Sequence, residues 1–150
     1  MITIKPSAVI REILFREGIC QRDHLQPWWC CRVKLPDGIG TVDNLIAIAD
    51  RDDVLTDRYI SDGNYVLDPH IQIVVRGVGL EDSYTKMKQI TDFLDPLQDY
   101  GITIAAVPLL YDEATFNIVG TKRTTNIQFN GADQTGRRYI HTIEYDIVMT

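Results

Sequence analysis

Thiol and imidazole side chains gather near the start of the chain, where Cys20, His24, Cys30 and Cys31 could bind zinc. Structural zinc sites separate two paired ligands by about two to four residues, so that both reach one ion. Here Cys30 and Cys31 are adjacent, and adjacent side chains on a strand point to opposite faces. The same divergence disfavours a disulfide between them. We therefore expect no metal site, and three reduced thiols as in a cytosolic protein.

A carboxylate-rich segment over 50–57 suggests calcium binding at first sight. An EF-hand loop counted from its first residue would need Asp or Asn at the fifth position, Gly at the sixth and Glu at the twelfth. Those positions hold Val54, Leu55 and Ser61. The segment is better explained as part of a solvated loop over 50–64. Compact domains seldom keep such a long loop unless it binds something.

A glycine pair, Gly77 and Gly79, stands between an expected strand and an expected helix, as in dinucleotide-binding sites. The third glycine of that pattern is replaced by Asp82. A carboxylate at a helix N-terminus occupies the place where a phosphate would bind, so Asp82 is predicted to be a helix cap. We expect no bound cofactor.

The histidines show no catalytic context either. They are scattered among expected strands and loops, at His24, His70 and His141. No Gly-x-Ser-x-Gly elbow or comparable nucleophile accompanies them. We therefore expect no enzymatic activity and assign no catalytic residue.

Composition and charge describe an ordinary globular chain. The sequence has 150 residues, of which 45% are hydrophobic and 24% charged, so it is long enough for one well-packed domain over 1–150. Its 15 basic and 21 acidic residues leave a net charge of −6, and only Lys122-Arg123 and Arg137-Arg138 form basic pairs. Specific nucleic-acid binding is therefore not expected. No apolar run approaches the ~20 residues of a membrane span, and no signal-peptide pattern is present, so we expect a soluble intracellular protein.

Hydrophobic periodicity predicts two helices and seven strands. The first helix spans 5–18, with Ser7 as a capping residue and Gly18 as its stop. The second spans 82–97, where apolar residues at spacings of three and four define a buried face: Tyr84, Met87, Ile90, Leu94 and Leu97. Strands are expected over 28–35, 45–49, 71–76, 102–110, 115–121, 124–130 and 137–149. The expected fold is α+β, a single domain with a largely antiparallel β-sheet flanked by two helices.

Two consecutive tryptophans, Trp28 and Trp29, stand on the first expected strand, so their rings should leave opposite faces of the sheet. One ring can enter the core. The other must be covered by the chain's own helices or by another chain, because Trp is enriched at interface hot spots. Trp28 and Trp29 are therefore the candidate oligomer interface.

Nearly all 150 residues of the sequence, and most specifically 70–97, resemble the tail terminator and minor capsid (head-tail joining) proteins of long-tailed bacteriophages. The resemblance is carried by His-Ile-Gln-Ile-Val-Val-Arg-Gly at 70–77 and by the Tyr-, Lys- and Leu-containing helix segment at 82–94. It continues through Phe-Asn-Ile-Val-Gly at 116–120, Arg-Thr-Thr at 123–125 and Asn-Gly-Ala-Asp at 130–133. The order of elements and the chain length are similar too. The adjacent tryptophans and cysteines near residue 30 depart from the family pattern.

The resemblance implies a structural virion protein, made in the host cytoplasm and located in the tail-neck region. Such proteins form a homo-oligomeric ring, generally a hexamer, that caps the tail tube and joins it to the head connector. The partners implied are the chain itself, the tail tube protein and the connector. Two alternatives remain open: another head-completion or tail-tube component, and a small intracellular enzyme or ligand-binding module whose site is not written in a local motif.

Overall fold

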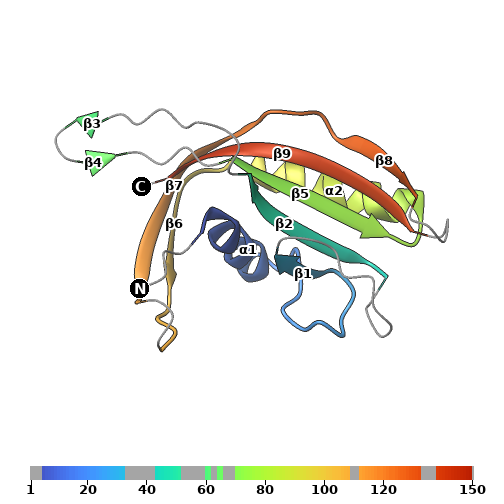
Figure 1. The fold of residues 1–150 in the computed structure, drawn as a ribbon, viewed down its shortest axis with the longest axis horizontal. Coiled ribbons are helices and arrows are strands. Elements are labelled where there is room, and N and C mark those ends of the chain that lie inside the picture. The colour runs from blue at the N-terminus through green and yellow to red at the C-terminus, as the bar shows by residue number, and fades with distance from the viewer. Residues whose placement is uncertain are drawn as a thin grey trace.

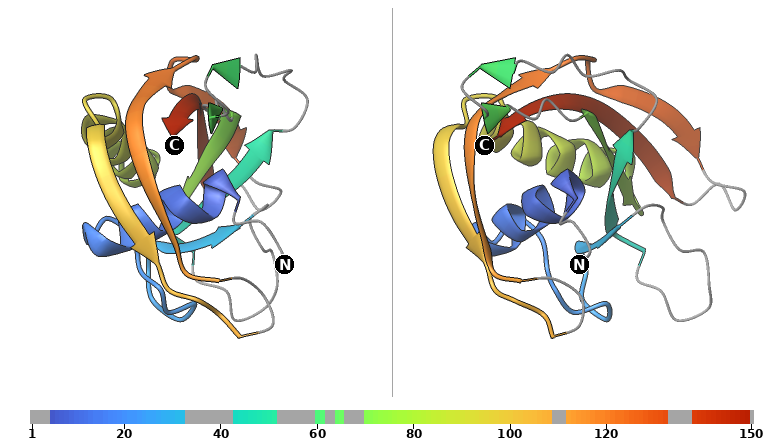
Figure 2. Two further views of the ribbon diagram at one scale, coloured as in Figure 1. Left: turned by 90° about the vertical axis from the view of Figure 1, so that its left-hand side faces the viewer. Right: turned by 60° about the vertical axis from the view of Figure 1, so that its left-hand side comes forward.

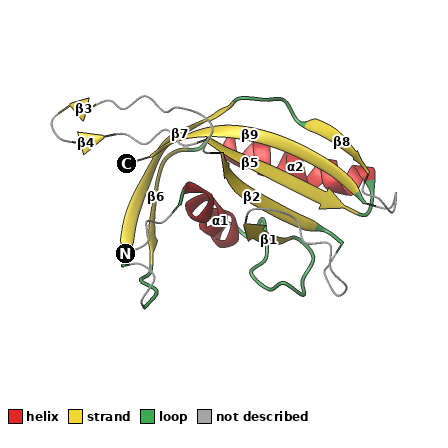
Figure 3. Ribbon diagram, in the orientation of Figure 1, coloured by secondary structure: helices red, strands yellow, loops and turns green. Residues whose placement is uncertain are grey.

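The computed structural model describes residues 5–32, 43–51, 60–61, 64–65, 70–108, 112–132 and 138–149 (Figure 1). Two helices and nine strands are formed in these ranges (Figure 3). In chain order they are α1 Pro6–Arg16, β1 Trp29–Arg32, β2 Leu45–Arg51, β3 Ile60–Ser61, β4 Asn64–Tyr65, β5 His70–Gly77, α2 Leu80–Leu94, β6 Gln98–Ile104, β7 Ala114–Arg123, β8 Gln128–Ala132 and β9 Tyr139–Met149.

Seven of the strands form one sheet with the order β1-β2-β5-β9-β7-β6, and β8 also pairs with β9. All of its pairings are antiparallel except β1 with β2. The short strands β3 and β4 pair separately. The predicted α+β class, with two helices in one domain on a largely antiparallel sheet, is confirmed.

The sheet curls around both helices, which pack on its concave face (Figure 2). The register explains this face, because Ile48 of β2, Ile73 of β5 and Ile143 of β9 are neighbours across three strands and all are fully buried. The helices contribute fully buried apolar residues to the same core: Val9, Ile10, Ile13 and Leu14 from α1, and Met87, Ile90 and Leu94 from α2. The predicted inward positions of these helices are confirmed, except at one residue.

That residue is Tyr84, which was predicted to be in the core but is 47% exposed. The buried stripe of α2 passes through Ser83 instead. The physical reason is the close approach of the helix to the end of β5: a Cβ at Gly77 would lie 2.9 Å from the Ser83 amide nitrogen and 3.0 Å from its Cβ. Only a small side chain fits between two backbones at that separation, so the serine faces inward and the tyrosine outward.

Both predicted N-terminal caps are wrong. The N-cap of α2 is Gly79, and Asp82 lies within the first turn, where a carboxylate still favours the helix dipole. Ser7 lies inside α1, whose N-cap is Lys5. A free backbone amide of the first turn is bonded instead by Asp50 of β2, which is distant in the sequence. The Asp50 carboxylate accepts hydrogen bonds from the Ser7 amide at 2.9 Å and from the Ser7 hydroxyl at 2.6 Å.

Several boundaries also differ from those predicted. Part of the expected 50–64 loop is strand, since β2 extends to Arg51 and β3 and β4 lie further along, while 52–59 and 62–63 fall outside the described residues. The strand expected over 102–110 begins earlier, as β6. The strand expected over 28–35 begins at Trp29, and 33–35 lies outside the described residues.

Candidate functional site

Trp28 and Trp29, the predicted interface, take different backbone roles. Trp28 precedes β1 and has a left-handed backbone, with φ of 64°. Two hydrogen bonds hold it there: its amide donates to the Asn44 carbonyl at 2.7 Å, and its carbonyl accepts from the Gln21 amide at 2.9 Å. A left-handed non-glycine residue costs about 1–2 kcal/mol, which these bonds must offset. The strand alternation used in the prediction therefore does not apply to Trp28.

The two rings nonetheless lie in different places, and both are half-buried. Trp28 packs against the core, and the Lys86 ammonium stands 5.1 Å from its ring centroid. Trp29 pairs with Leu45 on the face of the sheet opposite the helices, and its ring meets that of His24 edge-on at 6.1 Å between centroids. Each tryptophan is thus partly covered by the chain's own side chains, on opposite sides of the sheet. Their role in an interface stays a prediction.

The thiols are buried and reduced, with Cys20, Cys30 and Cys31 all below a tenth exposed. A hydrogen bond donated to Cys20, together with burial, raises the pKa of the Cys30 thiol well above its ordinary value. His24 lies apart from them, beside Trp29. Within the described ranges, no group of three or more His, Cys, Asp or Glu side chains is arranged to hold a metal ion.

The structure brings together one pair that the sequence did not predict, Ser83 of α2 and His141 of β9. The Ser83 hydroxyl lies 2.7 Å from His141 Nδ1 and 3.2 Å from the Leu80 carbonyl. Burial lowers the pKa of His141, which favours the neutral imidazole. A serine and a neutral histidine are the parts of a nucleophile and its base. Here, however, Ser83 is completely buried, so the pair joins α2 to β9 rather than facing a substrate.

A charged network crosses the outer face of the sheet. His70 Nδ1 lies 2.6 Å from an Asp146 carboxylate oxygen, and Arg51 forms an ion pair with Glu144 at 3.2 Å. The register creates this network, because β5 places His70 between Arg51 of β2 and Asp146 of β9. The alternation of side chains along each strand could have predicted that these residues share one face of the sheet. It could not have predicted which of them are neighbours on adjacent strands.

An exposed apolar surface covers the end of the domain where β5 ends and α2, β8 and β9 meet (Figure 1). Its most exposed members are Phe129 at 53%, Val78 and Leu80 at 49% each and Tyr84 at 47%. The ring of Phe129 lies 5.3 Å from that of His141, and the ring of Tyr84 lies 5.8 Å from it on centroid distances, so the two aromatics flank the buried histidine. We call Val78, Leu80, Tyr84 and Phe129 the aromatic end.

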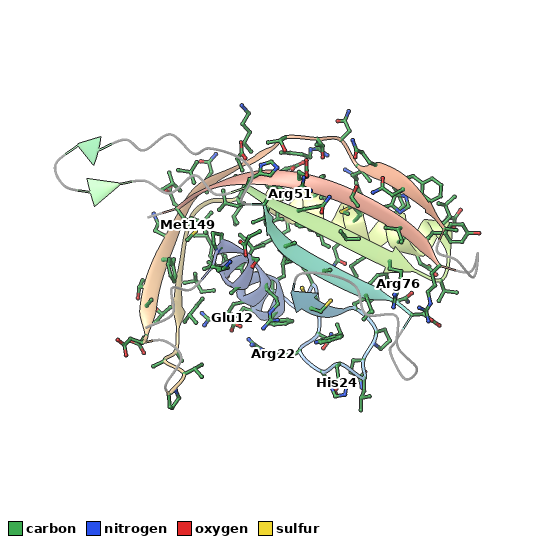
Figure 4. All side chains as sticks on the ribbon, in the orientation of Figure 1. Glu12, Arg22, His24, Arg51, Arg76 and Met149 are labelled. Atoms are coloured by element: carbon green, nitrogen blue, oxygen red, sulfur yellow. The ribbon has the colours of Figure 1, made fainter. Side chains whose placement is uncertain are left out.

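A single exposed apolar residue stands on the connection between α1 and β1. Leu25 is 62% exposed, at the tip of a turn in which Asp23 accepts hydrogen bonds from the amides of Leu25, at 2.9 Å, and Gln26, at 3.0 Å. Arg22 anchors the start of this turn through two hydrogen bonds to Glu12 of α1. Figure 4 shows His24 on this connection, away from the core. We call residues 22–27 the Leu25 turn.

Sequence reasoning missed both surfaces. The aromatic end is assembled from two segments that are distant in the chain, 78–84 and Phe129 of β8, so no local motif marks it. The Leu25 turn carries a weaker but readable signal, because Asp23 followed by Pro27 is turn chemistry and Leu25 is an apolar residue in a polar stretch.

The outer edges of the sheet are partly covered. Beside β1, Gln21 forms a single bridge to Trp29. At β6, the Arg16 guanidinium of α1 donates a hydrogen bond of 2.7 Å to the Thr103 carbonyl. Charged side chains placed on edge strands discourage unplanned pairing with other chains.

Comparison with known protein families and with curated proteins gives no match for this sequence. Among the described residues, neither helix has the length and apolar character required to cross a lipid bilayer.

Proposed function

We propose that the chain is a structural virion protein whose copies form a ring that caps a phage tail tube and joins it to the head connector. The observation that carries the proposal is the exposed apolar surface at the aromatic end, on a domain whose core is already complete without it. Apolar groups left exposed together commonly mark surfaces for protein contact.

The fold supports this proposal through the segment on which the family resemblance rests. The residues of the resemblance at 70–77 form one strand, β5, with the same limits. β5 pairs on both sides, with β2 and β9, and is followed directly by α2. A ring subunit needs a rigid frame that holds its contacting surfaces at fixed positions. A central strand bonded on both sides and packed beneath a helix provides such a frame.

The charge of the chain suits a ring through which DNA passes. Each subunit carries a net charge of −6, and a sixfold ring multiplies it. Tight binding of DNA depends on clustered positive charge that releases counterions. An acidic ring would let the genome pass without gripping its phosphates.

Reconstruction of virions that contain the protein tests the proposal. We expect one ring of copies, most simply six, at the head-proximal end of the tail. Copies stacked along the tube would favour a tail-tube component, and absence from the particle would favour a cellular enzyme or ligand-binding module. Either result would overturn the terminator function.

A further inference from the structure

We propose that β8 is an acid-sensitive cover of His141, which stays closed over the neutral imidazole and moves away from β9 when the imidazole is protonated. The observation behind it is that His141 is only 4% exposed, although the strand beside it is almost entirely exposed. Phe129 belongs both to β8 and to the aromatic end, so the cover makes that surface depend on pH. The inference concerns a single chain and does not rest on the proposed function.

The imidazole of His141 makes one hydrogen bond among the described residues, with the Ser83 hydroxyl at 2.7 Å from Nδ1. That hydroxyl donates its single hydrogen to the Leu80 carbonyl at 3.2 Å, so we assign the imidazole proton to Nδ1, which donates to Ser83. The other ring nitrogen, Nε2, then carries the lone pair of the neutral ring. Within the described part of the chain, no hydrogen bond reaches Nε2.

Apolar and aromatic side chains make up the rest of the surroundings of His141. Its neighbours across the sheet are Val75 of β5 and Phe129 of β8. The centroids of the Phe129 and Tyr84 rings lie 5.3 Å and 5.8 Å from that of the imidazole. Neither neighbouring strand places an ionisable side chain on this face, because Arg76 of β5 alternates to the other face and β8 has no ionisable residue.

The titratable groups near His141 therefore come from α2 and from β9 itself. Tyr84 meets the imidazole edge-on from α2, and Tyr139 lies two residues earlier on the same face of β9. Both are phenols, which are neutral in mild acid. The carboxylates of Glu81 and Asp82 belong to exposed residues in the first turn of α2. Burial lowers the pKa of His141, and no carboxylate counteracts this effect.

β8 is the element beside His141 that can move most easily. It lies at the edge of the sheet, pairs only with β9 among the described strands, and is exposed at every residue except Gly131 (Figure 1). A register shift between Phe129 and Ala132 interrupts the pairing, and one side-chain bond, from Asn130 Nδ2 to the Thr142 hydroxyl, supports it. In contrast, β5 is paired on both sides and α2 is held by a stripe of buried side chains. Elements with few buried contacts open first.

Protonation favours the open arrangement. It adds an N–H donor and a positive charge at Nε2, where no described residue accepts a hydrogen bond, and an unsatisfied buried donor is unfavourable. Because the pKa of His141 is lowered in the closed state, β8 is held most firmly above pH 6.5 and less firmly as the pH falls toward the lowered pKa. An accessible histidine titrates near 6.5, so opening at about pH 5 increases by at most about 30-fold.

Amide hydrogen exchange measured by NMR at about pH 7.5 and about pH 5 tests the cover. Dividing each rate by its intrinsic rate at the same pH gives protection factors for the amides of β8 and β5. His141→Asn is the test variant, because an asparagine amide does not titrate and can still bond to the Ser83 hydroxyl. His24→Asn is the matched control, since His24 lies exposed on the connection between α1 and β1 (Figure 4). Circular dichroism checks that both variants fold.

In the wild type and in His24→Asn, protection of β8 should fall by about 3- to 30-fold at the lower pH, and protection of β5 should change by less than about twofold. In His141→Asn, β8 should also change by less than about twofold. Protection of β8 that does not fall in the wild type, or falls equally in all three proteins, would overturn the cover. Equal losses in β8 and β5 would overturn it too, because they indicate global unfolding.

Titration of the His141 ring protons in the wild type keeps the test decisive if His141→Asn does not fold. The pKa should lie below that of His24 in the same spectra, and the pH at which β8 loses protection should follow the His141 titration. A His141 pKa at or above the ordinary 6.5 would overturn the proposal, because protonation would then not favour opening.

Discussion

The close approach of β5 and α2 makes Gly77→Ala a sharp test of the packing beneath the aromatic end. The added Cβ would lie 2.9 Å from the Ser83 amide nitrogen, 3.0 Å from its Cβ and 3.2 Å from its Cα. Two of these atoms are backbone, so a rotamer change cannot relieve the contact and the start of α2 must move. Overpacking of this kind costs about 1–3 kcal/mol. For a chain of this length that is about 2–12 °C in melting temperature.

The assay is urea denaturation followed by circular dichroism, with Gly101→Ala and Gly120→Ala as controls. Both glycines lie in strands of the same sheet, and nothing stands within 4 Å of a Cβ added to either. These controls should be neutral or gain up to about 1 kcal/mol from reduced freedom of the unfolded chain. A second readout is the His141 imidazole. Its pKa is lowered by burial, so displacement of α2 should raise it toward the ordinary value in an NMR titration. A Gly77→Ala protein as stable as its controls, with His141 unchanged, would refute the packing described here.

Three further predictions concern the core, one ion pair and the charge of the ring. Leu94→Ala should cost about 2–5 kcal/mol in the same denaturation assay because Leu94 is fully buried in the core, and a loss below about 0.5 kcal/mol would contradict that placement. The hydrogen bond from Arg22 lowers the pKa of Glu12, so this pair stabilises the fold above the unfolded value near 4.5 and is lost as the pH falls through the folded pKa. Glu12→Gln should therefore be less stable than wild type at neutral pH and converge with it in acid, whereas a constant difference between the two at all pH values would count against the pair. The purified protein should show no tight, salt-sensitive binding in fluorescence titrations with double-stranded DNA, and a steep loss of binding with added salt would oppose the acidic ring.

Sequence patterns correctly predicted the elements that are determined by their own residues. The apolar run at 71–76 became the centre of β5, and Gly18 ends α1 with a positive φ of 71°. The predictions failed where the cause lies far along the chain. Asp50 replaces a local cap for α1, and the backbone of Gly77 decides that Ser83 and not Tyr84 faces the core.

The candidate surfaces also differ in whether local sequence or distant residues determine them. Trp28 and Trp29 could be singled out because they are large and adjacent, and Trp29 does lie on the outer face of the sheet. The aromatic end could not be found in this way, since Phe129 becomes its neighbour only through the pairing of β8 with β9. The register of a strand pair depends on the packing of the whole sheet. Analysis of each strand segment by itself therefore cannot predict which residues become neighbours across the sheet.

The bond between Ser7 and Asp50 has a consequence for the order of folding. α1 has 11 residues and no side-chain cap of its own, and isolated helices shorter than about 12–15 residues are marginal in water. Its cap lies 43 residues further along the chain. During translation the α1 segment therefore leaves the ribosome well before the residue that completes its first turn. We expect α1 to consolidate only after β2 has been made, so that the first helix in the sequence is not the first element to become stable.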